Sequence, residues 1–203
     1  HIKGKFVNNG KAKGKVKVVS TIWNADRQKV STVQSLFRLK PDETAFEQDI
    51  KSIIDPKLWS PENPYLYTIT TQLVDQTGQI LDEVNSPLGF RWFRFDAKEG
   101  FFLNGKHYKL IGASRHQDFE GMGNAVPDAL QIEDVKLLKE MGGNFLRVAH
   151  YPQDPVILET CDKLGILTSV EVPIVNTITE SEAFYENCKS MHLEMIRQNF
   201  NHP

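Results

Sequence analysis

The first half of the chain alternates apolar and polar residues with a period of two. Runs rich in Val, Ile, Thr and Tyr cover residues 15–20, 33–38, 46–50 and 65–70. Turn signals such as Asn8-Asn9-Gly10, Lys40-Pro41-Asp42 and Asp75-Gln76-Thr77-Gly78 separate these runs. Alternation of this kind is typical of half-buried strands, and about seven short strands without a helix between them indicate a two-sheet sandwich. We therefore predict a β-sandwich domain over residues 1–95.

From about Phe101 the pattern changes to strands that alternate with amphipathic helices. Apolar runs at 108–115, 144–149 and 166–171 are each followed by a helical pattern, the last of which reaches about Asn199. Pro127 with Asp128, and Asp154 with Pro155, are helix-start signals, and Asp128 is expected to accept N–H groups of the first turn. Three successive strand–helix units predict parallel strands with helices packed outside them.

Two α/β architectures fit residues 96–203. No GxGxxG follows the first strand, which disfavours a nucleotide-binding doubly wound sheet and favours a (β/α)₈ TIM barrel. A barrel needs eight strands, so we expect the incomplete, N-terminal part of one, containing its first three βα units.

Composition and charge exclude several classes of protein. The chain has 203 residues, 40% of them apolar and 25% charged, with a formal net charge of −2. These values are ordinary for a globular protein, and no apolar run is long enough for a membrane span. Cys161 and Cys188 have no CxxC partner and are expected to be buried thiols. Neither they nor the N-terminal residues identify a compartment.

A basic run occupies the N-terminus. It comprises Lys3, Lys5, Lys11, Lys13, Lys15 and Lys17. Residues 1–95 hold 14 Lys and Arg against 10 Asp and Glu. A nucleic-acid interface would need interleaved aromatic residues, and only Phe6 is nearby. We interpret the alternating lysines as the solvated face of a strand and expect no nucleic-acid partner.

The candidate chemistry lies where the three parallel strands end, because functional groups of α/β barrels gather at the carboxyl ends of their strands. These positions hold Arg115 and His116, Arg147 and His150, and Glu171. Together they would form a polar floor suited to a hydroxyl-rich or anionic ligand. Each also has a structural interpretation: a rim salt bridge for Arg115, core histidines, and an Arg147–Glu171 ion pair.

A metal site and sugar-stacking platforms are weaker interpretations. His116, His150 and Glu171 could ligate a metal, but their spacing is wide and no HExxH occurs, so we expect no metal. Trp23 and Trp59 fall in the sandwich pattern and are expected at its core or sheet edge. Trp92 lies at the domain junction, where we expect an aromatic plug.

Several motifs together resemble glycoside hydrolase family 2, the β-galactosidase, β-glucuronidase and β-mannosidase group. They are Leu58-Trp-Ser-Pro-Glu-Asn-Pro-Tyr-Leu-Tyr67, Gly89-Phe-Arg-Trp-Phe93, Phe102-Leu-Asn-Gly-Lys106, Gly112-Ala-Ser-Arg-His-Gln-Asp118, Asn144-Phe-Leu-Arg-Val-Ala-His-Tyr-Pro152 and Asp162-Lys-Leu-Gly165. The resemblance covers most of the chain. It implies an immunoglobulin-like sandwich followed by a TIM barrel that hydrolyses β-glycosides with retention.

In that mechanism one Glu protonates the leaving oxygen and a second forms a glycosyl-enzyme intermediate. The resemblance places both Glu beyond Pro203, so the chain alone is expected to be inactive. His116 and His150 match histidines that bind sugar hydroxyls, Arg115 and Arg147 match arginines that orient carboxylates, and Glu171 matches the acid of the third strand.

Two departures from the family concern the sugar site. Val170 stands before Glu171 where many members have Asp, and Val175 and Thr177 stand where metal-dependent galactosidases carry an acid and a His. No cofactor or metal is therefore expected. A β-galactoside is the default substrate.

The rival hypothesis is a non-catalytic sandwich module that binds carbohydrate or a partner domain, with the α/β part as a scaffold. Under the glycosidase hypothesis the partners are a β-glycoside substrate and the remaining domains of a longer chain. A homo-oligomer is also allowed, and no membrane partner is expected.

Overall fold

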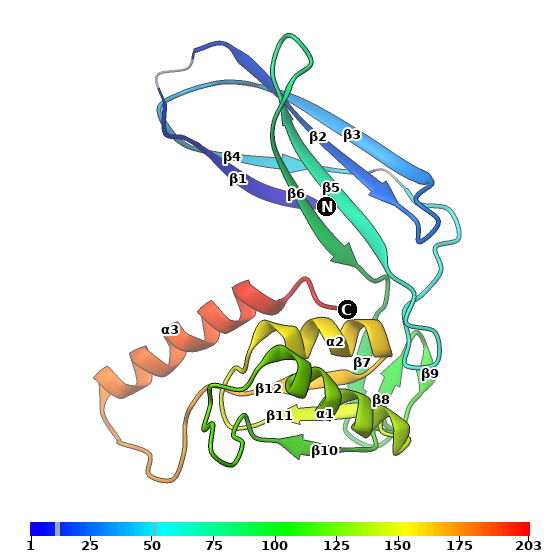
Figure 1. The fold of residues 1–203 in the computed structure, drawn as a ribbon, viewed down its shortest axis with the longest axis vertical. Coiled ribbons are helices and arrows are strands. Elements are labelled where there is room, and N and C mark those ends of the chain that lie inside the picture. The colour runs from blue at the N-terminus through cyan, green and yellow to red at the C-terminus, as the bar shows by residue number, and fades with distance from the viewer. Residues whose placement is uncertain (11–12, 51) are drawn as a thin grey trace. The chain divides into compact units, whose positions relative to one another are not determined.

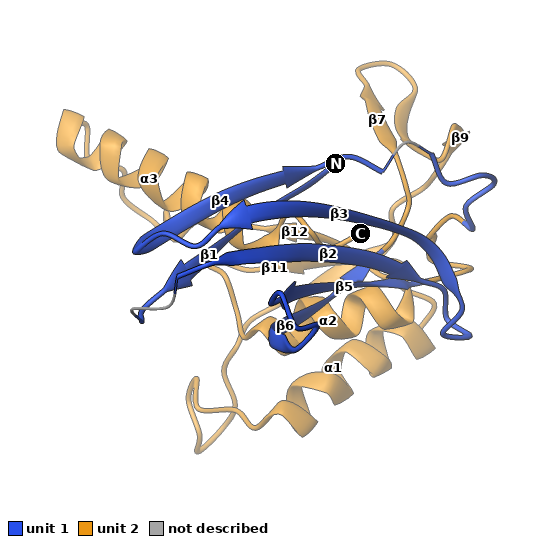
Figure 2. Ribbon diagram, turned by 90° about the horizontal axis from the view of Figure 1, so that it is seen from above, with its two compact units in different colours: residues 1–57, 66–88 blue, residues 58–65, 89–203 orange. Residues whose placement is uncertain are grey.

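The computed structural model describes residues 1–10, 13–50 and 52–203 (Figure 1). It divides into two compact units, coloured separately in Figure 2. The first contains residues 1–57 and 66–88, and the second contains residues 58–65 and 89–203. The segment 58–65 and the residues after Leu88 thus group with the α/β part of the chain.

The first unit consists of antiparallel strands. Its described strands are β1 (Ile2–Asn8), β2 (Lys15–Trp23), β3 (Lys29–Arg38), β4 (Asp42–Gln48), β5 (Tyr67–Val74) and β6 (Ile80–Leu88). They form a four-stranded sheet in the order β3-β2-β5-β6 and a separate β1-β4 pair. The predicted sandwich-like sheets are confirmed, with six described strands where the pattern predicted about seven.

The core of the first unit follows from the alternation in β2. Val16, Val18 and Ile22 are buried, as are Phe46 on β4 and Tyr67 on β5. The lysines between the buried positions of β2 face solvent, which confirms that this part of the basic run is a strand face. Lys11 lies outside the described residues.

The second unit opens with a hairpin and continues with parallel βα units. The hairpin sheet contains β7 (Phe93–Asp96), β8 (Gly100–Leu103) and β9 (Lys106–His107). A parallel sheet follows, with β10 (Gly112–Arg115), β11 (Phe145–Val148) and β12 (Leu167–Val170) in that order. Helices α1 (Asp128–Glu140), α2 (Pro155–Leu164) and α3 (Glu182–Asn199) follow these strands in turn. The predicted first three units of a TIM barrel are confirmed.

The helix boundaries show which of the two predicted N-terminal residues caps its helix. Asp154 caps α2, because its carboxylate accepts the Val156 N–H at 2.9 Å, and Gly165 ends α2 in a left-handed conformation with φ 72°. The expected cap at Asp128 is wrong: Pro127 is the N-cap residue of α1 and no side chain caps that helix. None of the helices in the described ranges is long and apolar enough to cross a membrane.

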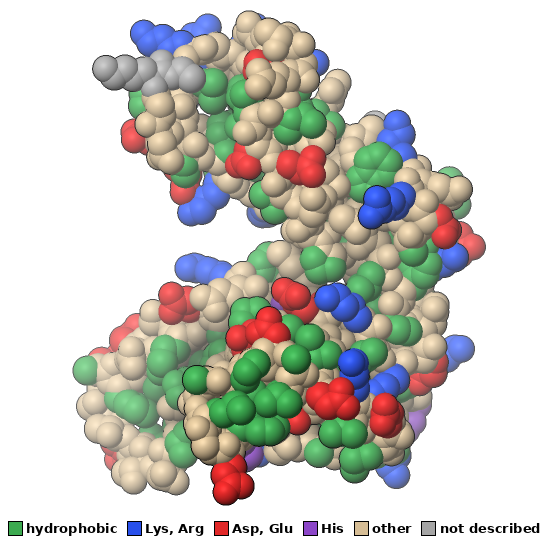
Figure 3. Space-filling view, viewed as in Figure 1, with side chains coloured by type: hydrophobic (Ala, Val, Ile, Leu, Met, Phe, Trp, Pro, Cys, Tyr) green, Lys and Arg blue, Asp and Glu red, His purple; other side chains and the backbone are tan. Residues whose placement is uncertain are grey.

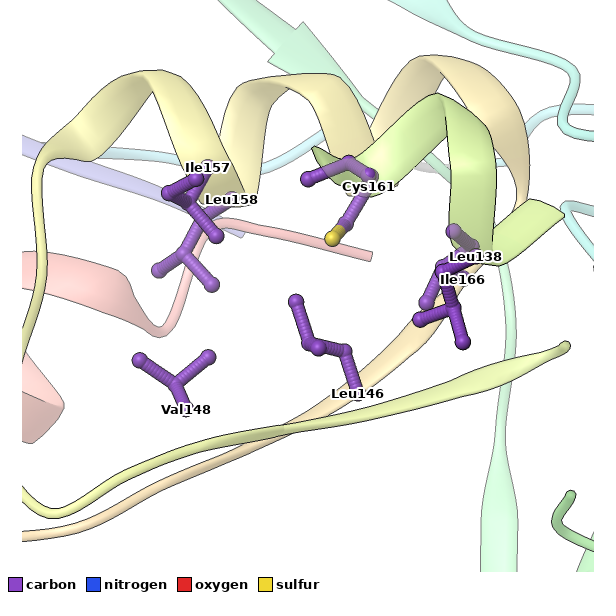
Figure 4. Close-up of a cluster of buried hydrophobic side chains, with 8 residues drawn as sticks. Leu138, Leu146, Val148, Ile157, Leu158, Cys161 and Ile166 are labelled. Atoms are coloured by element: carbon purple, nitrogen blue, oxygen red, sulfur yellow. The ribbon is translucent and has the colours of Figure 1, made fainter. Parts of the chain in front are cut away.

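The core of the second unit lies between the parallel sheet and helices α1 and α2 (Figure 4). Leu146 and Val148 of β11 face Val135 on α1 and Ile157 and Cys161 on α2, and all five are buried. Burial among these apolar groups raises the pKa of the Cys161 thiol to about 12. Cys188 on α3 is also a buried free thiol, as expected.

Trp59 is a core residue of the second unit rather than of the sandwich. Its side chain is fully buried, and its indole N–H donates to the backbone oxygen of Asp162 on α2 at 2.8 Å. Its own backbone oxygen accepts from Asn104 at 3.0 Å. The expectation that Trp59 belongs to the sandwich pattern is therefore wrong, because tertiary contacts override its place in the sequence. Trp92, expected to be a plug, is 55% exposed.

Candidate functional site

The two faces of the parallel sheet differ in chemistry. Ser114, Arg147 and Ser169 occupy equivalent positions on β10, β11 and β12. Residues one step further along each strand point to the opposite face, because side chains alternate across a sheet. Val148 at such a position is part of the apolar core under the helices. The face that carries Arg147 is therefore the polar, open face of the sheet.

Arg147 and Glu171 form a bidentate ion pair on the open face. The Arg147 Nε–H donates to Oε1 of Glu171, and an Nη2–H donates to Oε2 at 3.0 Å. A third N–H of the guanidinium lies 3.4 Å from the Ser114 hydroxyl. The planar guanidinium and the carboxylate match in geometry, so each fixes the orientation of the other. The predicted Arg147–Glu171 proximity is present.

His150 joins this pair from the loop after β11. Its Nδ1 lies 3.2 Å from Nη2 of Arg147 and 3.4 Å from Oε2 of Glu171. Nδ1 can accept from the guanidinium or donate to the carboxylate, but one nitrogen cannot do both at once. The His150 ring therefore has two hydrogen-bonding states, and a ligand that accepts a hydrogen bond from Arg147 or donates one to Glu171 would select one of them.

His116, from the loop after β10, packs edge-on against His150 with ring centroids 4.9 Å apart. The structure thus brings four of the five predicted site residues together: His116, Arg147, His150 and Glu171. They come from the carboxyl ends of three neighbouring strands, which is the arrangement expected for a barrel site.

The electrostatics of the cluster favour an ionised carboxylate. Hydrogen bonds from Arg147, and the positive charge of that guanidinium, hold the pKa of Glu171 below its ordinary value. The side chains remain accessible, with 41% of Arg147 and 29% of Glu171 exposed. The cluster therefore offers charged donors and acceptors to solvent on an open surface.

Arg115 does not join this cluster. It is paired in register with Val148 and so lies on the core face, where its side chain is 7% exposed. Its Nε–H donates to Asp134 of α1 at 2.9 Å, and its Nη1–H donates to Gln153 at 2.6 Å. The structure thus corrects the expectation that Arg115 points into the polar floor. The salt bridge suggested for Arg115 is present, and its partner is Asp134 of α1.

Arg115 instead contacts the loop that carries His150. Gln153 donates to the backbone oxygens of both Arg115 and Ala149, at 2.8 and 3.0 Å, and the Ala149 N–H donates to the Arg115 oxygen at 3.0 Å. These bonds tie the loop at 149–153 to the end of β10. Arg115 is therefore placed to position His150 from the opposite face of the sheet.

Three contributors were not singled out in the sequence: Ser114, Asp134 and Gln153. Ser114 could have been found by applying the period of two to each strand end, because it shares a face with Arg147. Asp134 lies on a helix and Gln153 in a loop, and no sequence signal marked their approach to Arg115.

The metal-ligating types of side chain are spread apart in the part of the chain that the structure describes. Among residues 1–10, 13–50 and 52–203 no three His, Cys, Asp or Glu side chains are grouped as a metal site would require. Val175, which stands where metal-dependent galactosidases carry an acid, is 46% exposed. The donor set of the cluster, with a guanidinium at its centre, suits a polar organic ligand better than a cation.

Comparison with known proteins identifies the family to which this chain belongs. The family model described as "Glycosyl hydrolases family 2" matches residues 1–91, and "Glycosyl hydrolases family 2, TIM barrel domain" matches residues 96–202. The chain belongs to glycosyl hydrolase family 2.

Individual relatives agree with this assignment. A putative β-glucuronidase of Formosa agariphila is 40% identical over 178 residues, which are 88% of this chain and 21% of that protein. A β-galactosidase of Thermoanaerobacter pseudethanolicus is 34% identical over 204 residues, covering 100% of this chain and 26% of the relative. The crystal structure of Bacteroides uniformis β-glucuronidase matches 99% of the chain and 24% of its own, with 42% identity and a TM-score of 0.94.

The chain therefore spans about a quarter of the length of these family 2 relatives. It corresponds to the part that contains the sandwich and the start of the barrel.

Proposed function

We propose that this chain is the sandwich and the first three barrel units of a retaining β-glycosidase. The observation that carries the proposal is the cluster of His116, Arg147, His150 and Glu171 at three successive strand ends of a family 2 barrel. Support for retention comes from a B. uniformis β-glucuronidase, 42% identical to this chain, whose structure is described as covalently bound to cyclophellitol-6-carboxylate aziridine.

The four clustered residues act as the floor of the sugar site. His116 and His150 bind sugar hydroxyls, since an imidazole offers one donor and one acceptor. Arg147 holds Glu171 ionised and in a fixed orientation, and Glu171 accepts a hydrogen bond from a hydroxyl. Arg115 acts as a positioning residue through Gln153 and the 149–153 loop, not as a contact to the sugar.

Hydrolysis itself needs two further carboxyl groups, one as acid and base and one as nucleophile, about 5–5.5 Å apart. Glu171 is the only carboxylate in the cluster among the described residues. Both of its oxygens accept hydrogen bonds from Arg147, and these contacts keep it ionised. We assign the acid/base and the nucleophile to the remaining chain of the whole protein. The 203-residue chain alone is therefore expected to be inactive.

The substrate class is a β-glucuronide rather than the β-galactoside expected by default. Relatives described as β-glucuronidases reach 40–42% identity, whereas those described as β-galactosidases reach 38%. A glucuronide differs from a galactoside in carrying a carboxylate at C6 and in the configuration at C4. Discrimination can therefore use cationic or hydrogen-bonding groups at C6 as well as contacts to the hydroxyl at C4.

The test is a panel of p-nitrophenyl β-glycosides assayed with the whole protein that contains this chain. We expect turnover of the β-glucuronide at least about tenfold above the β-galactoside and the β-mannoside in kcat/KM. The 203-residue chain should show none. Equal or greater turnover of the galactoside would overturn the glucuronide assignment, and no turnover of any glycoside would favour a non-catalytic binding module.

A further inference from the structure

The basic N-terminal run divides into two different environments. On β1, Lys3 and Lys5 form ion pairs with Glu47 and Glu43 of the neighbouring strand β4, at 2.9 and 2.8 Å. The charge of this part of the run is therefore balanced within the unit. A second group of cations lies at the end of the unit where β2 begins and β3 ends, and it is not balanced.

This second group consists of Lys13, Lys15, Arg38 and Lys40. Lys15 and Arg38 are direct cross-strand partners in the antiparallel β2–β3 register. The Leu39 N–H donates to the Gly14 oxygen at 2.9 Å, which keeps the two chain segments together beyond the strands. Like charges placed directly opposite each other destabilise a strand pair. Lys15 facing Arg38 is therefore an unfavourable arrangement unless an anion lies between them.

The protein supplies no such anion from its described residues. None of the four cations forms an ion pair with an acidic group there. Glu43 is engaged by Lys5, and Asp75 uses its carboxylate to accept hydrogen bonds from the backbone of Thr77 and Gln79 in its own turn. A charge that would compensate the group must come from outside the chain.

The four cations line a concave site instead of a flat surface. The cavity they share has a volume of about 740 Å³, and Leu39, Pro41 and Gln76 also line it. Figure 3 shows Lys and Arg side chains together at one end of the first unit. The cavity therefore combines positive charge, an amide and an apolar floor.

We propose that this cavity binds an acidic oligosaccharide, one that carries carboxylate or sulfate groups. Several separate cations match a ligand with several separate anionic groups, and a volume of this size holds a short oligosaccharide. The rings of sugars have apolar faces that can rest on Leu39 and Pro41. Among the described residues that line the cavity, none has an aromatic side chain on which nucleic-acid bases could stack. The choice of a saccharide among anionic ligands rests on the proposed glycosidase function.

The test is isothermal titration calorimetry of the 203-residue chain with five probes: tetragalacturonic acid, a heparin-derived tetrasaccharide, neutral maltotetraose, sodium sulfate and a single-stranded oligodeoxynucleotide. We expect saturable binding of the two acidic tetrasaccharides and none of maltotetraose. The double variant K15Q/R38Q should weaken this binding by about tenfold or more, because it removes two charge-assisted contacts.

The matched control is K3Q/K5Q, which removes the same amount of charge from the N-terminal basic run. We expect it to change the affinity by less than about twofold, because its lysines are paired and lie outside the cavity. Equal losses in both double variants would mean that bulk charge attracts the ligand, and would overturn the proposal. Competition by sodium sulfate at the same concentration would overturn the saccharide assignment, as would tighter binding of a single-stranded oligodeoxynucleotide.

Failure of this proposal and failure of the proposed function can be told apart. If the acidic tetrasaccharides do not bind while the whole protein turns over glycosides normally, only the proposal about the cavity is overturned. Binding that survives in the K3Q/K5Q variant and is lost in K15Q/R38Q supports the cavity whatever the glycoside assay shows.

Discussion

Arg115 and Arg147 occupy similar places in the sequence and different places in the molecule. Each lies near the carboxyl end of a parallel strand, and each forms an ion pair with a carboxylate. Arg115 pairs with Asp134 in the layer between sheet and helices, with 7% of its side chain exposed, whereas Arg147 pairs with Glu171 on the open face and is 41% exposed.

The difference arises from a shift of one residue in register. Arg115 is opposite Val148, and Arg147 is opposite Ser114. Because side chains alternate across a strand, one step moves a side chain from the ligand face to the core face. Nearness to a strand end therefore does not by itself make a residue part of a barrel site; the side chain must also point to the open face.

The largest expected effect on stability comes from the core face itself. Ile157 is fully buried between sheet and helix. Ile157→Ala should lower the free energy of unfolding by about 3–4 kcal/mol through lost burial and a residual cavity. Ser169→Ala on the open face should change it by no more than about 0.5 kcal/mol. Urea denaturation of the two variants measures both, and similar losses would contradict the two-face account.

The two arginines give the next contrast. Arg115→Met removes the side-chain partner of the Asp134 carboxylate and of the Gln153 amide oxygen. It should lower the free energy of unfolding by about 2–3 kcal/mol. This is below the range for a fully buried pair because the Asp134 side chain is 30% exposed. Arg147→Met breaks an exposed pair and should cost less than about 1 kcal/mol. The same denaturation experiment tests the order, and a greater loss for Arg147→Met would reverse the assignment of faces.

A buried carboxylate in the helix layer gives a smaller, pH-dependent effect. Asp162 is 4% exposed and accepts a hydrogen bond from His202 Nδ1 at 2.6 Å, and this bond raises the pKa of His202 above 6.5. The resulting stabilisation is present below pH 6.5 and is lost as the pH rises through the folded-state pKa. His202→Asn should remove about 1 kcal/mol at pH 6 and less at pH 9. An equal loss at both pH values would contradict this.

The exposed carboxylate of the open face should give the smallest effect and the opposite pH direction. Arg147 lowers the pKa of Glu171 below 4.5, so the stabilisation is complete above pH 4.5 and is lost as the pH falls through the folded-state pKa. Solvent screening limits it to less than about 1 kcal/mol. Thermal unfolding of Glu171→Gln and of the unchanged chain should differ at pH 7, and the difference should shrink as the pH falls through the folded-state pKa of Glu171. A constant difference would exclude the ion pair as its cause.

Most of the fold follows from local patterns, whereas parts of the site do not. The period of two in β2 and the helix-start signal at Asp154 were sufficient to predict the strand and the start of α2, because local sequence and tertiary structure agree there. Trp59 was assigned to the wrong unit because its contact with Asp162 joins residues 103 positions apart. The Arg147–Glu171 pair was predictable from strand ends, whereas placing Arg115 also required the alternation of side chains along β10, which puts Ser114 and not Arg115 on the face of Arg147.

The most direct test of the account is kcat/KM for p-nitrophenyl β-glucuronide in the whole protein, measured for Arg147→Met and Arg115→Met at a temperature where both are folded. If the open face binds the sugar, Arg147→Met should lower kcat/KM by about 100-fold or more, while Arg115→Met should lower it by less than about tenfold. A change of less than threefold for Arg147→Met, or a greater loss for Arg115→Met, would contradict the assignment of the site to that face.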